Sequence, residues 1–260
     1  MARRTPFTYE MLEQYQRLGP DPHLSHVYRI DENTAVKFGD SVRMAEAAAM
    51  GFVREKTSIP IPEVYDSYVQ DGSKYGCIVM EYVNGSRLDE EWESYDKGQK
   101  DGIISQLKQY FNELRSTPGT FVGSVDLTHC EDQFFSDDRG SYCPFESEAA
   151  FNDGLIRAVR ARGSHSWAEM VVRFIKALPR HKIVLTHNDL SPRNILVRNA
   201  KVVAIVDWEL SGFYPAYWEY VKAYFWPDWE SPWVTEGIVD KIIEPFTLEL
   251  AYMLHVRDII

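Results

Sequence analysis

The chain has 260 residues, 45% of them hydrophobic and 26% charged, which is enough apolar material for one large domain or two lobes. Its formal net charge of −11 argues against nucleic acid as the main partner, because phosphate binding needs a basic face. This acidity suits a cationic substrate or a metal-dependent site, although solubility explains it equally well.

The first part of the chain is predicted to form strands and one helix. Residues 24–39 read as two short strands joined by a polar turn. Residues 41–57, rich in Ala and Met, predict a helix with Ser41 as its N-cap. Residues 59–69 read as an extended connection, because each proline biases its predecessor away from helix. Residues 75–83 are a continuous apolar run, as expected of a buried strand.

The pattern then becomes helical. Two segments each place their apolar side chains on one helical stripe, and Pro179 ends the second of them. The stripe residues are Ile103, Ile104, Leu107, Tyr110, Phe111 and Leu114, then Trp167, Met170, Val171, Phe174, Ile175 and Leu178. Residues 118–150 read as loops with short helices. Beyond Asp207 we expect aromatic helices, with Pro215 in the first turn of one.

Polar residues interrupt the apolar run between these regions. The segments "KIVLT" and "NILVR" read as strands, and the turn Asn199–Ala200 leads back into a third, "KVVAIVD". A hairpin of this kind brings Asp207, where the last strand ends, close to Asn194, with Asp189 in the preceding loop. Such an oxygen-rich site suits Mg²⁺ and a phosphate. Single polar residues often only cap turns, but several at ordered spacing favour a site.

The motif "HNDLSPRN", followed by "ILV" and "IVDWE", resembles the catalytic loop and metal-binding Asp of kinase-like phosphotransferases. In this form it looks most like the aminoglycoside phosphotransferase and choline kinase superfamily, in particular its fungal-type members of unassigned substrate. The resemblance implies an α+β, two-lobed protein kinase-like fold. Residues 1–84 would form an ATP-binding lobe with a small antiparallel sheet and one main helix, and residues 85–260 a larger, mainly helical catalytic and substrate-binding lobe.

The resemblance also implies roles for the motif residues, with ATP and Mg²⁺, or Mn²⁺ in its place, as cofactors. Asp189 would orient the substrate hydroxyl and accept its proton, and Asn194 and Asp207 would hold the metal ions. His187 is expected to be a hydrogen-bonded scaffold residue. Arg193 would lie near the phosphates and help to neutralise their charge, or simply lie at the surface.

A kinase-like site also needs a lysine on a strand and a glutamate on the next helix to fix it. Lys37 in "TAVKFG" and Glu46 in "VRMAEAAAM" meet this need. The expected nucleotide-binding residues are Ser25, Val27, Ala35, Lys37, Glu46, Met80, Glu81, Tyr82, Val83, Leu196 and Val206. The glycines of a protein kinase phosphate loop are absent, since Pro20, Pro22 and Ser25 occupy their positions. The loop would therefore be stiffer, or would bind phosphate through the Ser25 hydroxyl and the backbone amides near His26.

A small-molecule acceptor is favoured over a protein, because no long activation segment follows Asp207 and Ser191 replaces the catalytic-loop lysine of protein kinases. The last 53 residues hold nine acidic and three basic groups, which would attract an amino-sugar or choline-like alcohol. Asp228, Glu230 and Trp226 are the preferred acceptor contacts. The alternatives are a nucleotide-binding pseudo-enzyme or regulatory module, and a protein Ser/Thr kinase.

The remaining features concern location. Cys77, Cys130 and Cys143 are an odd number without metal-type spacing, as expected of free thiols in a reducing compartment. The start "MARRTPFTYE" lacks the apolar stretch of a secretory signal, and no apolar run approaches the roughly 18 residues of a membrane span. We therefore expect a cytoplasmic protein, a monomer or weak dimer, that binds neither membrane nor nucleic acid.

Overall fold

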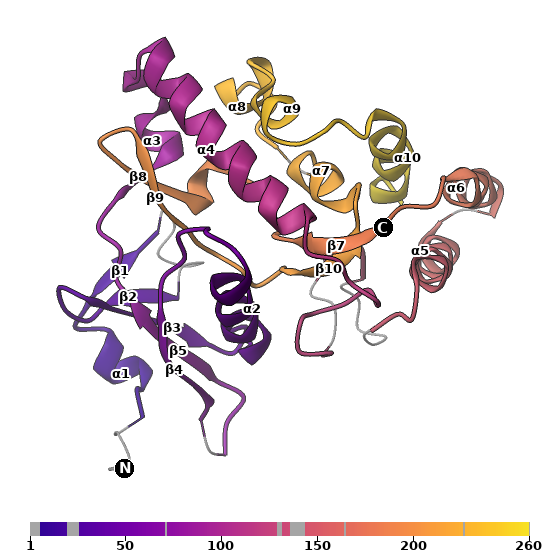
Figure 1. Cartoon of the computed structure of the whole chain (residues 1–260). Coiled ribbons are helices and arrows are strands. Elements are labelled where there is room, and N and C mark those ends of the chain that lie inside the picture. Colours follow the sequence, from indigo (N-terminus) through magenta and orange to yellow (C-terminus); the bar gives the residue numbers. More distant parts are fainter. Residues whose placement is uncertain are drawn as a thin grey trace.

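The computed structural model in Figure 1 describes residues 6–19, 26–70, 72–128, 132–135, 144–163, 165–225 and 227–259. The predicted site residues Ser25 and Trp226 lie outside the described residues, as do Cys130 and Cys143. Within the described chain, an antiparallel sheet precedes a mainly helical region, so the predicted α+β class is confirmed.

The N-terminal region is built on a five-stranded antiparallel sheet of the described residues, in the order β1-β2-β3-β5-β4. Its strands are β1 (Gln16–Leu18), β2 (Val27–Arg29), β3 (Thr34–Gly39), β4 (Val64–Val69) and β5 (Gly76–Glu81), and its helices are α1 (Tyr9–Leu12) and α2 (Met44–Lys56). The register of β3 on β5 pairs Lys37 with Ile78 and Ala35 with Met80. Since α2 packs against β4 and β5, the sheet fixes the position of this helix.

Two local predictions for this region were wrong. Helix α2 begins at Met44 with Arg43 as its N-cap, and no side chain caps it, so Ser41 is not the cap. The predicted extended connection includes strand β4, because Val64 and the residues after it pair with β5. The β2–β3 hairpin and strand β5 were predicted correctly.

The C-terminal region is arranged around the long helix α4 (Figure 1). The elements before residue 187 are β6 (Ser86–Arg87), α3 (Leu88–Glu91), the 3-10 helix η1 (Trp92–Ser94), α4 (Lys97–Arg115), η2 (Gln133–Phe135), α5 (Glu148–Arg162), α6 (His165–Ala177) and β7 (Ile183–Thr186). Those after it are η3 (Pro192–Asn194), β8 (Ile195–Arg198), β9 (Lys201–Ile205), β10 (Gly212–Pro215), α7 (Trp218–Ala223), α8 (Pro232–Thr235), α9 (Ile238–Ile242) and α10 (Thr247–Arg257).

The predicted β8–β9 hairpin is confirmed, with positive φ at both residues of its turn, 52° at Asn199 and 55° at Ala200. Strand β7 does not join this hairpin but pairs with β10, a strand in a segment predicted to be helical. Pro215 therefore ends a strand, and α7 begins only at Trp218. Pro215 is tolerated at the end of β10 because a proline in an edge strand need not donate a hydrogen bond to the neighbouring strand.

Helix α4 buries the core of its predicted stripe, since Ile103, Leu107, Phe111 and Leu114 are all inaccessible to solvent. In α6 the prediction was partly wrong: Trp167 and Met170 are 42% and 41% exposed, and Ala168 and Val172 are buried in their place. Helix α5 was not predicted, although its buried residues Phe151, Leu155 and Val159 follow helical spacing.

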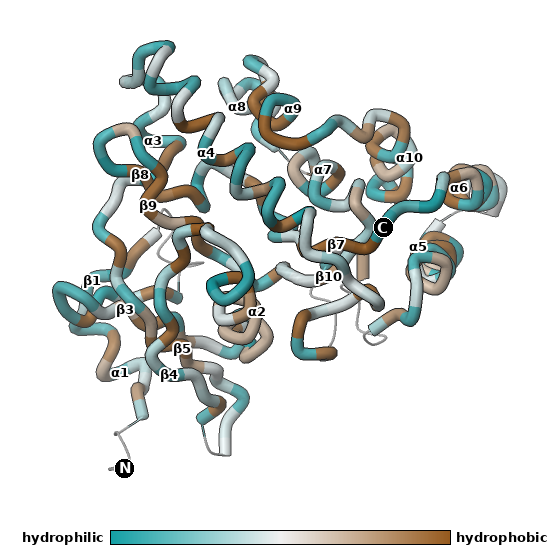
Figure 2. The backbone as a smooth tube through the Cα atoms, in the orientation of Figure 1, coloured by the Kyte–Doolittle hydropathy of each residue, from teal (hydrophilic) through white to brown (hydrophobic). Residues whose placement is uncertain are grey.

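One hydrophobic cluster joins the two regions. It includes Met50 and Val53 of α2, Phe111 of α4 and Ile205 of β9. Figure 2 shows hydrophobic tube on β7 and β9 and alternating hydrophobic and hydrophilic segments along α4. Since α2 is part of this core, the helix is held by the C-terminal region as well as by the sheet.

Gly76 should be intolerant of a side chain. A Cβ at this first residue of β5 would lie 2.0 Å from the Val42 carbonyl oxygen, so the backbone must shift. We expect Gly76→Ala to lower the free energy of unfolding by about 1–3 kcal/mol, the usual cost of overpacking. Gly51→Ala is the matched control: with open space around it in α2, it should stabilise by about 0.5–1 kcal/mol. Urea unfolding of both variants checks this, and equal stabilities would contradict it.

Candidate active site

A cleft of about 1080 Å³ lies between the sheet and the C-terminal region. Nearly all of the predicted nucleotide-binding and metal-binding residues line it, drawn from β2, β3, α2, β5 and the segment around the β8–β9 hairpin. They are Val27, Ala35, Lys37, Glu46, Met80, Glu81, Tyr82, Val83, Asn194, Leu196, Val206 and Asp207. Residues far apart in the sequence thus meet at one site.

Lys37 is the centre of the charged part of this cleft. Its Nζ lies 3.0 Å and 2.8 Å from the two Glu46 carboxylate oxygens and 3.0 Å from Oδ1 of Asp207. Glu209 contributes a third carboxylate at 3.1 Å. The predicted lysine–glutamate pair is therefore formed. Glu209 was not predicted as a site residue, although it stands in the "DWE" motif.

The charge states of this cluster follow from burial and mutual attraction. Burial alone would lower the pKa of Lys37, but Glu46, Asp207 and Glu209 raise it well above its ordinary value. Burial would raise the pKa of Asp207, yet Lys37 and the more distant His187 and Arg193 hold it below its ordinary value. Burial raises the pKa of Glu46 to about 7 despite Lys37. Glu46 is thus the member that titrates near neutral pH.

The raised pKa of Glu46 predicts that the affinity for nucleotide depends on pH. Above about pH 7 Glu46 is a carboxylate that holds Lys37; below it, the protonated form loses that attraction. We expect the affinity for an ATP analogue to fall as the pH drops from 8 to 6, and Glu46→Gln to bind more weakly with a flatter profile. The phosphates of the analogue titrate in this range in both proteins, so the difference between the profiles isolates Glu46. Calorimetry across this range provides the test, and parallel profiles would contradict the prediction.

The backbone of the 187–194 loop is held by a buried carboxylate from α7. The N–H groups of His187 and Asn188 donate to Glu219 at 2.6 Å and 3.0 Å, and burial raises the pKa of Glu219 to about 7. Asn188 has a φ of 67°, a left-handed conformation that Asn tolerates better than most residues, and its Nδ2 donates to the Leu210 carbonyl. No sequence pattern singled out Glu219 for this role.

His187 connects two strand ends. It is fully buried, its Nε2 lies 3.0 Å from the Val206 carbonyl oxygen, and the N–H of Asp189 donates to its Nδ1 at 3.1 Å. Burial lowers the pKa of His187, in keeping with a neutral ring that donates at Nε2 and accepts at Nδ1. These contacts agree with the predicted scaffold role.

Asp189, Arg193 and Asn194 form a hydrogen-bonded group in which Arg193 and Asn194 line the cleft, whereas Asp189 contacts both without lining it. Asn194 donates through Nδ2 to the Asp189 carbonyl at 3.1 Å and to its Oδ2 at 2.7 Å, which leaves Oδ1 of Asn194 as the atom suited to a cation. The N–H of Val206 donates to the Asn194 carbonyl at 2.9 Å. The hairpin therefore brings the end of β9 beside Asn194, as predicted.

Two backbone N–H groups at the end of β5 and directly after it already have hydrogen-bond partners. The N–H of Glu81 donates to the Glu63 carbonyl and that of Tyr82 to the Asn33 carbonyl, both at 2.8 Å. The Arg29 guanidinium lies 4.2 Å from the centre of the Tyr82 ring. Of Glu81, Tyr82 and Val83, which are expected to bind the nucleotide, the first two therefore have their N–H groups committed elsewhere.

The structure does not bring the described acceptor candidates to this cleft. Asp228 and Glu230 are exposed in a turn, where the N–H of Glu230 donates to the Asp228 carboxylate, and neither lines the cleft. Trp229 stacks on Tyr224 with ring centres 6.3 Å apart, and Trp233 is buried against Trp92.

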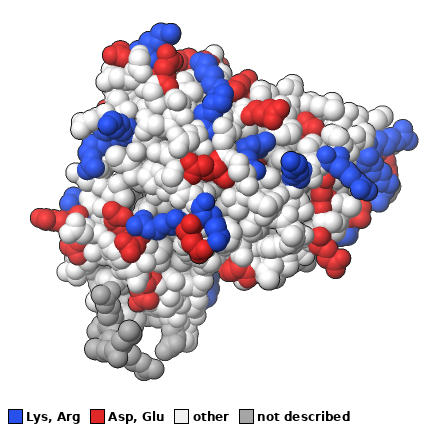
Figure 3. Space-filling model, viewed as in Figure 1, with Lys and Arg blue, Asp and Glu red and all other residues white. Residues whose placement is uncertain are grey.

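Several C-terminal carboxylates have structural partners instead of attracting a substrate. Besides Glu219, Asp240 accepts hydrogen bonds from the hydroxyls of Tyr220 and Tyr224, and Glu249 lies 3.1 Å from His181 Nε2. On the face seen in Figure 3, acidic and basic side chains are interspersed. The net charge of this region is thus weak support for a cationic acceptor.

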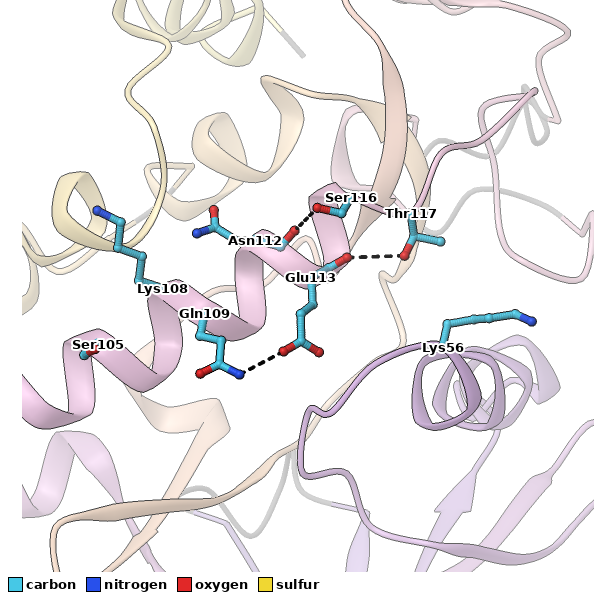
Figure 4. Close-up of a pocket in the computed structure, with 8 residues that line it drawn as sticks. All are labelled: Lys56, Ser105, Lys108, Gln109, Asn112, Glu113, Ser116 and Thr117. Carbon is cyan, nitrogen blue, oxygen red and sulfur yellow. Dashed lines mark hydrogen bonds between the residues drawn. The ribbon is translucent and has the colours of Figure 1, made fainter.

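A second hollow, of about 610 Å³, lies between α4 and the C-terminal end of α2 (Figure 4). Its lining is polar, and Gln109 donates to Glu113 there. Glu113 also accepts hydrogen bonds from the N–H and hydroxyl of Ser58 at 2.6 Å and 2.7 Å. This carboxylate therefore joins α4 to the segment after α2, a structural role.

The antiparallel sheet, the helical region and the Lys37–Glu46–Asp207 cluster between them define a protein kinase-like phosphotransferase fold. The model of the phosphotransferase enzyme family (APH) matches residues 27–244, so the chain belongs to this family. Among curated proteins, none matches this chain. Among the described residues, no helix is both long and apolar enough to span a membrane.

Solved aminoglycoside phosphotransferases have the same fold. A thermostable mutant of APH(4)-Ia in its apo form is 15% identical with a TM-score of 0.62, over 94% of this chain and 85% of that one. The streptomycin–ATP complex of APH(2")-IIa is 17% identical with a TM-score of 0.60, over 97% and 87%. ADP-bound APH(2'')-Ib is 19% identical with a TM-score of 0.58, over 93% and 80%.

Proposed function

We propose that this protein transfers the γ-phosphate of ATP to a hydroxyl group of a small molecule in a Mg²⁺-dependent reaction. The observation that carries the proposal is the cluster in which Lys37 is held by both Glu46 and Asp207 beside the catalytic loop. A fixed cation, its orienting carboxylate and a metal-binding Asp are the parts that phosphoryl transfer requires. In this proposal residues 1–84 form the ATP-binding lobe and residues 85–260 the catalytic and acceptor-binding lobe.

The nucleotide would lie in the cleft with its base between Ala35 and Leu196 and with Met80 at the back. Because the N–H groups of Glu81 and Tyr82 are committed, the Val83 N–H and the Glu81 carbonyl would bind the adenine edge. Lys37 would bind the α- and β-phosphates.

The oxygen ligands available near the phosphates fit Mg²⁺. Oδ1 of Asn194 and the carboxylates of Asp207 and Glu209 are hard donors of the kind that Mg²⁺ prefers. Bound there, Mg²⁺ would offset the negative charge of the phosphates. One lysine beside three carboxylates leaves this part of the cleft with excess negative charge, which favours a cation.

Asp189 would act on the acceptor. Its carboxylate would orient the acceptor hydroxyl and take its proton as the oxygen attacks the γ-phosphorus, and ADP would leave with the electrons of the broken P–O bond. The short connection between Asp207 and α7, residues 208–217, contains β10 and offers no peptide-docking segment. This supports a small acceptor, of which an amino-sugar or choline-like alcohol is our first candidate.

Radiolabelled ATP and a panel of amino-sugars, choline-like alcohols and ketosugars test the proposal. We expect Mg²⁺-dependent label transfer to at least one acceptor, and loss of transfer in Asp189→Ala. ATP hydrolysis without an acceptor gives a second readout. If the wild type and Asp189→Ala hydrolysed ATP equally slowly and neither labelled an acceptor, an enzymatic function would be contradicted.

A further inference from the structure

Arg193 is bound to the carboxylate that we assign as the catalytic base. Its Nη2 lies 3.1 Å from Oδ1 and 3.0 Å from Oδ2 of Asp189. Asn194 donates to the same Oδ2. Oδ2 of Asp189 therefore accepts from two donors and Oδ1 from one. The guanidinium of Arg193 is thereby held at Nη2.

The Arg193 side chain is also partly exposed at the cleft. Arg193 lines it beside Asn194 and Asp207, and its side chain is 54% exposed, whereas that of Asp189 is 25% exposed. The contacts with Asp189 use Nη2, which is one of the three donor nitrogens of Arg193. An arginine that stabilised only the fold would not need this position.

We propose that Arg193 bridges the catalytic base and the phosphoryl group in transfer, with Nη2 on Asp189 and its remaining N–H donors on the γ-phosphate. This proposal rests on the proposed function. Charge develops on the equatorial oxygens of the γ-phosphoryl group in the transition state, and a planar guanidinium fork matches two such oxygens. Because Asp189 would orient the Arg193 guanidinium, the γ-phosphorus would be held beside the Asp189 carboxylate that accepts the proton.

The bridge adds no reactant to the transfer. The acceptor oxygen bonds to the γ-phosphorus, the bond from that phosphorus to the bridging oxygen of ADP breaks, and the proton passes to Asp189. Arg193 stays protonated throughout and changes only its distances to oxygen. It would thereby supply the positive charge that Ser191 cannot supply in this loop.

Arg193→Ala tests the bridge, with ATP hydrolysis in Mg²⁺ as the assay. We expect kcat to fall about 10²–10³-fold, as for removal of one transition-state donor, while the dissociation constant of a non-hydrolysable ATP analogue changes less than about threefold. Added methylguanidine should restore part of the rate, and Arg193→Lys should lose less than Arg193→Ala. Arg198→Ala, an exposed arginine at the end of β8, is the matched control and should behave as wild type.

A double mutant separates this role from a structural one. If Arg193 acts with Asp189, adding Arg193→Ala to Asp189→Asn should cost only a few-fold more than Asp189→Asn alone. If the wild type binds and hydrolyses Mg·ATP but Arg193→Ala has an unchanged kcat, the role proposed for Arg193 is overturned. The proposed function is not affected by that result. Fully additive effects without methylguanidine rescue would also overturn the role proposed for Arg193. A wild type that does not bind Mg·ATP would instead refute the proposed function.

Discussion

Asp189→Asn should stop phosphate transfer while leaving Mg·ATP binding within a few-fold of wild type. The amide keeps the size of the carboxylate but cannot accept the acceptor proton. General-base catalysis is worth roughly 10²–10⁴-fold, so we expect kcat to fall by at least that range. Label transfer measures the rate, and calorimetry with a non-hydrolysable ATP analogue measures binding.

Asp101→Asn is the control for this substitution, because Asp101 is exposed on α4 outside the cleft. It should leave both quantities unchanged. A kcat within tenfold of wild type in Asp189→Asn would exclude Asp189 as the base. A large loss of nucleotide binding would instead indicate that Asp189 shapes the nucleotide site.

Asp207→Ala should remove the Mg²⁺-dependent part of nucleotide binding. The residue lies two positions after the end of β9 with a positive φ of 65°, and its carboxylate lies 3.0 Å from Lys37 Nζ. Groups that only orient metal ligands are worth 10–100-fold in affinity, so loss of a ligand itself should cost at least about 100-fold. Nucleotide affinity measured in Mg²⁺ and in EDTA separates the Mg²⁺-dependent part of binding from the metal-free part.

The metal-free affinity is the internal control for Asp207→Ala. Loss of a negative charge beside the phosphates should leave that affinity equal or slightly higher, because Lys37 is retained. Thermal unfolding should confirm that the variant is folded. Equal Mg²⁺-dependent binding by Asp189→Asn and Asp207→Ala would contradict the separate roles of base and metal ligand.

The central residues could be predicted because each occupies a fixed place in a regular element. Lys37 lies within a strand, Glu46 on the helix that follows, and Asp207 two residues after a strand, and the resemblance of the 187–194 motif to kinase-like phosphotransferases indicated that they meet. Glu219 could not be found in this way. Its role arises from the packing of α7 under the catalytic loop, and a glutamate on a helix resembles a solvated one until its neighbours are known.

The wrong predictions also have physical causes. Trp167 and Met170 satisfy the spacing of an apolar stripe, but α6 turns Ala168 and Val172 toward the core instead. Strand β10 is too short for a period to emerge, and its pairing with β7 depends on contacts distant in sequence. The acceptor site depends on how loops and helix ends meet, which local patterns do not encode.

The segment after α2 is fastened to the C-terminal region at two points, through Ser58 to Glu113 and through the Pro60 carbonyl to the N–H of Ile205. Helix α2 therefore cannot swing outward without breaking contacts with α4 and β9. In protein kinase-like folds an inward or outward position of this helix decides whether the lysine–glutamate pair exists. Here these two contacts hold α2 in the position in which the Lys37–Glu46 pair is formed, so this part of the cleft is preorganised and nucleotide binding would lose little conformational entropy in ordering it. Regulation of this protein's activity would therefore have to act on a part of the structure other than the position of α2.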